Sequence, residues 1–278
     1  MSQDKPLKLW TMAELWDELS RWQSYAKSYE NRERALRDEI MRRPRGVLSD
    51  QEILEALERE DIAIDPFDRS RLHPAGCRNL NTASYDIRLG EWYYLCEAMP
   101  FESDFNPWDP EDVERYYNGP LRAVTNQEWC DRYRQGRLWN EIPADALIIV
   151  LRPGECILGH TQEYIGSRRD VVTMMHARSS IGRVNISTCD DAGWGDIGYI
   201  NRWTMEIRNK NNAVVPLVVG ERVGQIIFFA SGLTTRSYGS EGHYQLSTDL
   251  NELQQLWRPE DMLPRLQLDC VIQGEDHD

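Results

Sequence analysis

The sequence predicts a mostly β fold, a distorted β-barrel or jelly roll, preceded by a helical extension. From residue 80 onward, short apolar segments follow one another closely, among them ALIIVL at 146–151 and RVGQIIFFA at 222–230. Pro-Gly and Gly-Glu turns separate several of them, and short strands at such spacing are typical of barrels and sandwiches rather than βαβ units. Before residue 46, large apolar residues instead recur at helical spacing.

Residues 1–45 form the predicted helical extension. Thr11 is the expected N-cap, because Glu14 follows it three residues later, as in a capping box. Pro44 ends the helix, since proline cannot continue one. The apolar side chains at helical spacing are Trp10, Met12, Leu15, Trp16, Leu19 and Trp22.

The barrel domain is expected to span residues 46–250. It begins with a short helix, in which Ser49 and Glu52 form a second capping box. Residues 97–145, rich in Pro, Asn, Asp and aromatic residues, are interpreted as an insertion that covers the core, with a helix near 126–137. Residues 251–278 are predicted to be a polar tail on the surface, interrupted by Pro259 and Pro264.

The charge balance excludes some classes of partner. The chain has 278 residues, with 32 Lys and Arg against 46 Asp and Glu, so the formal net charge is −14. Such an acidic protein is a poor candidate for non-specific binding to nucleic acid or to an anionic membrane. No apolar run approaches the roughly 20 residues of a membrane span, and the first residues lack the apolar core of a signal peptide. We therefore expect a cytoplasmic protein.

The six cysteines show no metal-binding pattern. They form no CxxC pair and no His–Cys cluster with zinc-ligand spacing, so reduced structural thiols are expected. The HxE…PCxxC pattern of zinc deaminases is also missing from the sequence, which argues against zinc chemistry. The cysteines are Cys77, Cys96, Cys130, Cys156, Cys189 and Cys270.

The segment RSSIGR at 178–183 follows a predicted strand and is expected to form one helical turn. Ser179 and Arg183 are four residues apart and share a face of that turn. Backbone N–H groups at a helix start favour phosphate, and Arg178 adds a charged fork. The alternative is a serine N-cap beside a solvated arginine.

The segment AGWGDIGY at 192–199 is a glycine-rich turn that carries one carboxylate and two aromatic residues. Glycines let the backbone approach a ligand, and an aromatic ring can stack on a sugar or base. The alternative is a hairpin with a buried tryptophan.

The next segment alternates with the period of a strand. Trp203, Met205 and Ile207 are predicted to face the core, and the opposite face carries Thr204, Glu206 and Arg208. A glutamate on such a face is ordinarily solvated.

Taken together, these motifs resemble the dCTP deaminase branch of the trimeric dUTPase-like superfamily over about residues 46–248. Motif order agrees, as do the 13-residue step from Ser179 to Ala192 and the 14-residue step from Ala192 to Glu206. The segments that carry the resemblance are GVLSDQEI, ASYDIRLG, LRPGECILGHTQEYI, RSSIGR, AGWGDIGY, MEIRN and VGERVGQIIF.

The resemblance implies a catalytic group of three residues. Glu206 would be the catalytic carboxylate, taking a proton from water and returning it to the leaving amine. Ser179 and Arg183 would orient the water and stabilise the tetrahedral intermediate. Dedicated dUTPases have an apolar residue at the position of Glu206, and a glycine-rich closing arm that this chain lacks.

The resemblance also implies substrate contacts. Asp196 would contact the 3′-hydroxyl of deoxyribose, Tyr199 would pack against the sugar, and Ala192 would lie near the base. Arg178 would bind the triphosphate, and Ser180 is a further expected substrate-binding residue. The tail residues Tyr238, His243 and Tyr244 complete the expected set, although His243 and Ser247 replace the Lys and Gln that the family usually has.

The implied reaction is hydrolytic, zinc-independent deamination of dCTP to dUTP and ammonia. Mg²⁺ would be carried on the triphosphate, dTTP could inhibit, and a homotrimer would place each active site between subunits. One alternative is a bifunctional enzyme that continues to dUMP and diphosphate, since Asp196 is in place. Another is a non-catalytic deoxynucleotide-binding regulatory protein.

Overall fold

The computed structural model describes residues 11–42, 46–68, 79–96, 104–190, 192–232 and 234–268. The chain divides into two compact units, residues 1–45 and residues 46–278. Among the described residues, no helix is long and apolar enough to cross a membrane.

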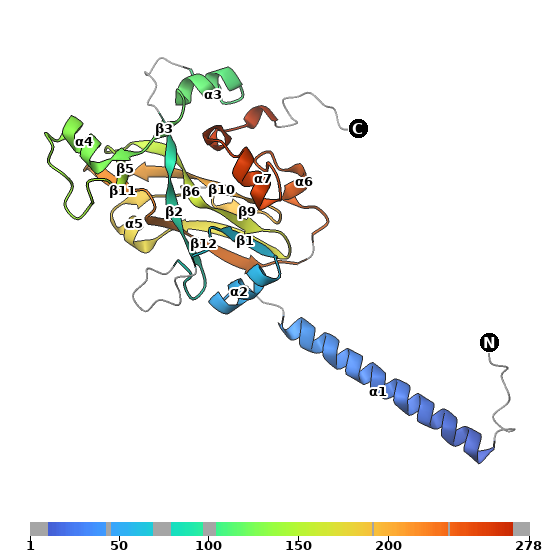
Figure 1. Cartoon of the computed structure of the whole chain (residues 1–278). Helices are drawn as coiled ribbons and strands as arrows, with labels where there is room; N and C mark the ends of the chain where they lie inside the picture. The colour runs from blue at the N-terminus through green and yellow to red at the C-terminus, as the bar shows by residue number, and fades with distance from the viewer. Residues whose placement is uncertain are drawn as a thin grey trace. The chain divides into compact units, whose positions relative to one another are not determined.

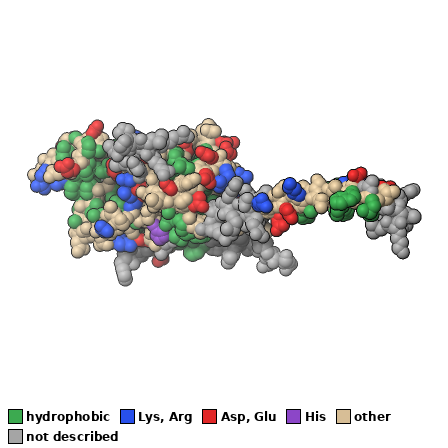
Figure 2. Space-filling view, turned by 90° about the horizontal axis from the view of Figure 1, so that it is seen from below, with side chains coloured by type: hydrophobic (Ala, Val, Ile, Leu, Met, Phe, Trp, Pro, Cys, Tyr) green, Lys and Arg blue, Asp and Glu red, His purple; other side chains and the backbone are tan. Residues whose placement is uncertain are grey.

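The first unit contains helix α1, Met12–Arg42. The predicted N-cap is confirmed: the Thr11 backbone N–H donates to Glu14 Oε2 at 2.7 Å, and the Glu14 N–H donates to Thr11 Oγ1 at 3.3 Å. Large apolar side chains lie exposed along this helix, including Trp16 at 61% and Trp22 at 66% (Figure 2). Packing within the described residues of this unit therefore leaves the apolar stripe of the helix uncovered.

The second unit is built on a curled antiparallel sheet of nine strands (Figure 1). The main path runs β8-β10-β6-β2-β12-β7-β9, with β1 paired to β6 and β3 paired to β2. A smaller sheet has the order β11-β5-β4. The strands are β1 Ile62–Asp65, β2 Tyr85–Leu95, β3 Leu121–Arg122, β4 Val124–Thr125, β5 Leu147–Leu151, β6 Cys156–Ser167, β7 Val171–Ala177, β8 Ile186–Ser187, β9 Trp194–Gly195, β10 Ile200–Asn209, β11 Val215–Val218 and β12 Arg222–Ala230. The mostly β prediction is confirmed.

The helices of this unit are short. Helix α2, Asp50–Glu58, starts at the predicted capping box of Ser49 and Glu52. The others are α3 Pro110–Tyr117, α4 Asn126–Tyr133, α5 Ser179–Arg183, α6 Tyr238–Glu241, α7 Leu250–Leu256, and the 3-10 turns η3 Pro259–Met262 and η4 Leu266–Leu268.

The main core lies between the two sheets, because alternate residues of their strands point inward. Tyr85, Ile157, Ile226 and Phe228 of the large sheet are fully buried there, together with Leu151 of the small one. Cys96, Cys130 and Cys156 are free thiols, and Cys77 and Cys270 lie outside the described residues.

The 97–145 segment is integrated into both sheets. Its strand β3 pairs with β2, and β4 pairs with β5. The helix expected near 126–137 is α4, which ends at Tyr133. Residues 97–103 lie outside the described part of the chain.

The C-terminal segment contributes a second core rather than only covering the surface as predicted. Leu253, Trp257 and Met262 are buried there against Tyr94 of β2 and Tyr164 of β6. Figure 1 shows α7 beside the large sheet. The sequence did not predict that these three residues are buried, because apolar residues spaced four or five apart in a polar segment make no continuous run.

Candidate active site

One cavity of about 420 Å³ collects many of the residues singled out in the sequence. That volume is in the usual range for small-molecule sites, roughly 300–1,000 Å³. Strand β10, the 192–199 turn, the 238–244 segment and the C-terminal segment supply most of its walls. The lining residues are Tyr117, Leu158, Ala192, Trp194, Gly195, Asp196, Tyr199, Asn201, Arg202, Trp203, Thr204, Glu206, Tyr238, Tyr244, Asp261, Met262 and Pro264.

Glu206 enters this cavity from the polar face of β10. The predicted alternation is confirmed, because Trp203, Met205 and Ile207 are buried on the other face. Glu206 lies opposite Leu158 of β6, is only partly exposed, and has its Oε2 oxygen shielded from solvent. The expectation of an ordinary solvated glutamate is therefore wrong.

Tyr117 of α3 lies near this carboxylate. Burial raises the pKa of the Tyr117 hydroxyl, and the negative charge of Glu206 contributes to the same shift. Tyr117 therefore presents a neutral phenol to the cavity at physiological pH.

The glycine-rich turn places its polar and aromatic residues on the cavity. Trp194 is 54% exposed, so the alternative of a hairpin with a buried tryptophan is wrong. Its Nε1–H donates to Asp196 Oδ1 at 3.0 Å, which orients the carboxylate. Gly198 has a φ of +94°, and a Cβ there would collide with Ser237, so this close turn requires glycine.

Tyr199 is held by two other aromatic residues of the site. Its ring meets Trp203 edge-on at 5.2 Å and Tyr238 edge-on at 5.4 Å between centroids. Burial raises the pKa of the Tyr199 hydroxyl. Tyr244 is fixed as well, because its backbone carbonyl accepts from Asn201 Nδ2 at 2.8 Å.

The RSSIGR segment does not reach this cavity in its own chain. It forms the predicted helical turn, α5, with Ser179, Ser180 and Arg183 exposed to solvent. Arg178 takes the N-cap position and no side chain caps the turn, so the serine-cap alternative is wrong. Within one chain, Ser179 and Arg183 therefore do not line the cavity that contains Glu206, although they are expected beside it.

His243 also lies outside the cavity lining. Its side chain is exposed, and its backbone carbonyl accepts from Arg265 Nη1 at 2.7 Å. Ser247 donates its hydroxyl to Glu252 Oε2 at 2.6 Å.

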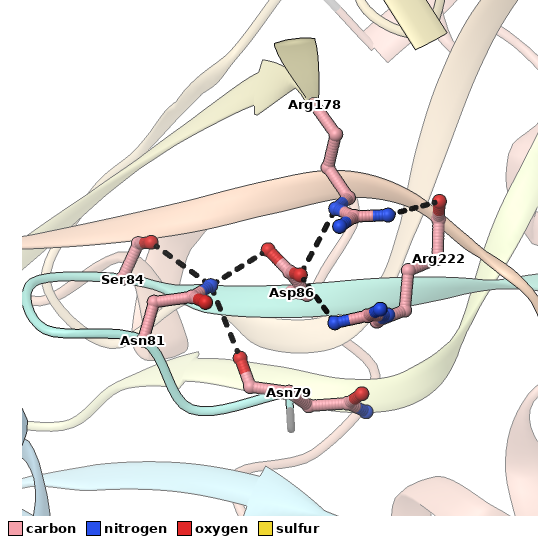
Figure 3. A network of polar contacts seen from close by, with 6 residues as sticks. All are labelled: Asn79, Asn81, Ser84, Asp86, Arg178 and Arg222. Atoms are coloured by element: carbon pink, nitrogen blue, oxygen red, sulfur yellow. Dashed lines mark hydrogen bonds and ion pairs between the residues drawn. The ribbon is translucent and has the colours of Figure 1, made fainter. Parts of the chain in front are cut away.

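Arg178 belongs to a separate polar network centred on Asp86 of β2 (Figure 3). Its Nε lies 2.9 Å from Asp86 Oδ2, and Arg222 Nη1 lies 3.1 Å from the same oxygen. Asn81 Nδ2 donates to Asp86 Oδ1 at 2.9 Å. Burial raises the pKa of Asp86, and the two guanidinium groups oppose that shift. The network joins β2, β12 and the start of α5, and so holds the RSSIGR turn on the sheet.

Several cavity residues had no role in the sequence analysis. Extending the β10 alternation back from Thr204 would have identified Arg202. Asp261, Met262 and Pro264 carry no comparable signal, because their place depends on how the C-terminal segment packs. The remaining unassigned polar and aromatic lining residues are Tyr117, Trp194 and Asn201.

Comparison with known proteins shows the family of the chain. Residues 47–231 match a family model described as dCTP deaminase-like. The chain therefore belongs to the dCTP deaminase-like family.

Individual relatives carry a more particular name. The chain is 32% identical over 201 residues to "dCTP deaminase, dUMP-forming" of Methanopyrus kandleri, covering 71% of this chain and 90% of the relative. It is 30% identical over 195 residues to the protein of the same name from Tropheryma whipplei, covering 70% and 83%.

Among solved structures, it is similar to the 2′-deoxycytidine 5′-triphosphate deaminase from Agrobacterium tumefaciens. The TM-score is 0.44 and the identity 19%, with coverage of 67% of this chain and 48% of that chain. The match thus spans about half of the solved protein's length.

Proposed function

We propose that this chain deaminates dCTP and converts the product to dUMP. The carrying observation is the cavity that joins Glu206 to Ala192, Asp196 and Tyr199, the residues that the family resemblance assigns to chemistry, base and sugar. The dUMP-forming names of the relatives favour this outcome over release of dUTP.

In the first step, water adds to C4 of cytosine. Glu206 takes a proton from that water and returns it to the amine, which leaves as ammonia. Shielding of Glu206 Oε2 from solvent supports this role, because a carboxylate away from bulk water is a more effective base. Both proton transfers use Glu206, so the scheme needs no zinc.

In the second step, water attacks the α-phosphorus and diphosphate leaves. The overall change is dCTP plus two water molecules to dUMP, ammonia and diphosphate. Asp196 would hold the 3′-hydroxyl or the attacking water, and Tyr199 would pack on the sugar. Mg²⁺ enters with the triphosphate as part of the substrate.

We further propose that the working unit is a homotrimer. Ser179, Ser180 and Arg183 are exposed and outside the cavity of their own chain. Docking α5 against the cavity of a neighbouring copy would add the water-orienting and phosphate-binding groups that one chain leaves out.

The test is product analysis after incubation with dCTP and Mg²⁺. Ammonia with dUMP and diphosphate supports the proposal, ammonia with dUTP indicates deamination alone, and binding without turnover indicates a regulatory protein. Glu206→Gln should lower ammonia release about 10²–10⁴-fold while nucleotide still binds.

Glu221→Gln is the matched control, because Glu221 is an exposed carboxylate in the turn before β12 and is not among the cavity-lining residues. It should leave the rate unchanged. Near-normal turnover by the Glu206 variant would contradict the assignment.

A further inference from the structure

Arg202 stands out among the residues that line the cavity. It lies on β10 four residues before Glu206, and its place in the strand puts it on the same face as Thr204 and Glu206. Among the described lining residues it is the single Lys, Arg or His, and the carboxylate residues Asp196, Glu206 and Asp261 line the same cavity. A guanidinium is the side chain best suited to a directional contact with a ligand oxygen.

Two aromatic rings hold this guanidinium. Arg202 Cζ lies 4.7 Å from the ring centroid of Trp257 and 5.0 Å from that of Tyr164. Trp257 is itself fixed, since it is 7% exposed and contacts the His160 ring at 4.7 Å. Cation–π contacts at this range stabilise an arginine and fix the plane of its fork. Trp257 lies beyond the residues that match the family model, 47–231, in the C-terminal segment.

The Nε–H group of Arg202 has no hydrogen-bond acceptor within the described residues, and its nitrogen is shielded from solvent. Aromatic faces hold the cation but are not conventional acceptors. Since buried donors in folded proteins are nearly always paired, this group is suited to an acceptor that a bound ligand supplies.

The position of Arg202 relative to Glu206 is suited to a nucleotide. Four residues of strand span about 13 Å, and a long side chain can cover part of that distance. A pyrimidine nucleotide with its amine at Glu206 is long enough to place another of its oxygen atoms near Arg202. The carbonyl oxygen of the base and a phosphate oxygen are both acceptors for a guanidinium fork.

We propose that Arg202 is a nucleotide-binding residue that donates hydrogen bonds to an oxygen of the bound pyrimidine nucleotide, with Trp257 and Tyr164 as its positioning residues. The identity of the ligand rests on the proposed function. The C-terminal segment thus takes part in substrate binding through Arg202, as well as forming one wall of the cavity.

The test is equilibrium binding in the Glu206→Gln background, where no turnover interferes. Dissociation constants are measured for deoxycytidine, dCMP and dCTP with Arg202, Arg202→Gln and Arg202→Lys. Arg202→Gln should weaken binding about tenfold or more, and lysine should restore only part of it, because an ammonium lacks the fork. Weakening that includes deoxycytidine assigns the oxygen to the nucleoside, and weakening confined to dCMP and dCTP assigns it to phosphate.

Arg208→Gln is the matched control. Arg208 is on the same face of β10 but reaches Asp190, at 3.4 Å, and is not a lining residue. Its loss should leave all three dissociation constants unchanged. Equal affinities for Arg202 and folded Arg202→Gln would overturn the proposal.

Trp257→Leu tests the positioning role. It keeps an apolar side chain but removes the cation–π contact, so it should weaken binding when Arg202 is present. It should have no further effect in Arg202→Gln, whereas a merely structural role predicts equal losses in both backgrounds.

Two outcomes separate this proposal from the proposed function. If the wild-type protein binds nucleotide but does not convert it, the proposed reaction is wrong, and the role of Arg202 is still decided by the dissociation constants. If the wild-type protein binds none of the three ligands, both proposals are wrong. If Arg202→Gln does not fold, the Arg202 Nε–H resonance of the intact protein decides: a shift on saturation with dCTP supports the contact, and an unchanged signal refutes it.

Discussion

His160 should make the stability of this protein sensitive to mild acid. Its side chain lies on β6 and is 2% exposed. The Trp92 backbone N–H donates to its Nε2 at 3.2 Å, so the neutral ring carries its proton on Nδ1 and donates to the Thr161 carbonyl at 2.8 Å. Protonation would turn Nε2 into a second donor facing the Trp92 N–H. Burial is the main cause that lowers the pKa of His160 to about 4, and the charge of Arg202 adds to it.

The sign and size of the effect follow from linkage. The unfolded chain protonates this histidine near pH 6.5, and the folded chain only near 4. Between these values the unfolded state binds more protons, so the free energy of unfolding decreases as the pH falls. The neutral His160 makes its full contribution to the free energy of unfolding above pH of about 6.5. About 2 kcal/mol of that contribution is lost at pH of about 5, and about 3 kcal/mol is lost below pH of about 4.

The assay is urea unfolding followed by tryptophan fluorescence, at one protein concentration and several pH values between 5 and 8. The difference in unfolding free energy between wild type and His160→Gln should shrink by about 2 kcal/mol over that range, since contributions from other groups cancel. A constant difference for His160→Gln over this range would refute the reasoning. If that variant does not fold, the wild-type His160 NMR signal should stay unshifted down to pH of about 5.

Two further substitutions test the scaffold of the site. Asp86→Asn removes the buried charge that faces Arg178 and Arg222, and should cost about 3–5 kcal/mol of unfolding free energy. Asp190→Asn breaks a partly exposed pair with Lys210 and should cost under about 1 kcal/mol, so equal small losses in urea would contradict this account. Gly198→Ala combines a positive φ with a collision at Ser237, whereas Gly154→Ala has a positive φ but open space. The first should therefore lower the melting temperature more and raise KM, and a comparable response of both variants would argue against the close turn.

The sequence alone was sufficient for the features that depend on near neighbours along the chain. Both capping boxes, at Thr11 and at Ser49, form as predicted, because a cap involves residues only three positions apart. The alternation of β10 placed Glu206 on the polar face, because side chains of a strand alternate whatever the strand pairs with. The family resemblance of the motifs implied that Asp196 and Tyr199 contact one ligand, and both residues line the cavity that Glu206 enters.

Tertiary structure decided which of these side chains meet. Arg178 lies in a network with Asp86 and Arg222 rather than among the residues lining the cavity, and Arg202 is held by a tryptophan 55 positions later in the chain. Nothing in the local pattern around Trp257 indicates a contact with β10, because that contact follows from the burial of the C-terminal segment against β2 and β6. Local signals arise from backbone geometry over a few residues, whereas long-range contacts depend on how whole segments bury their apolar surface.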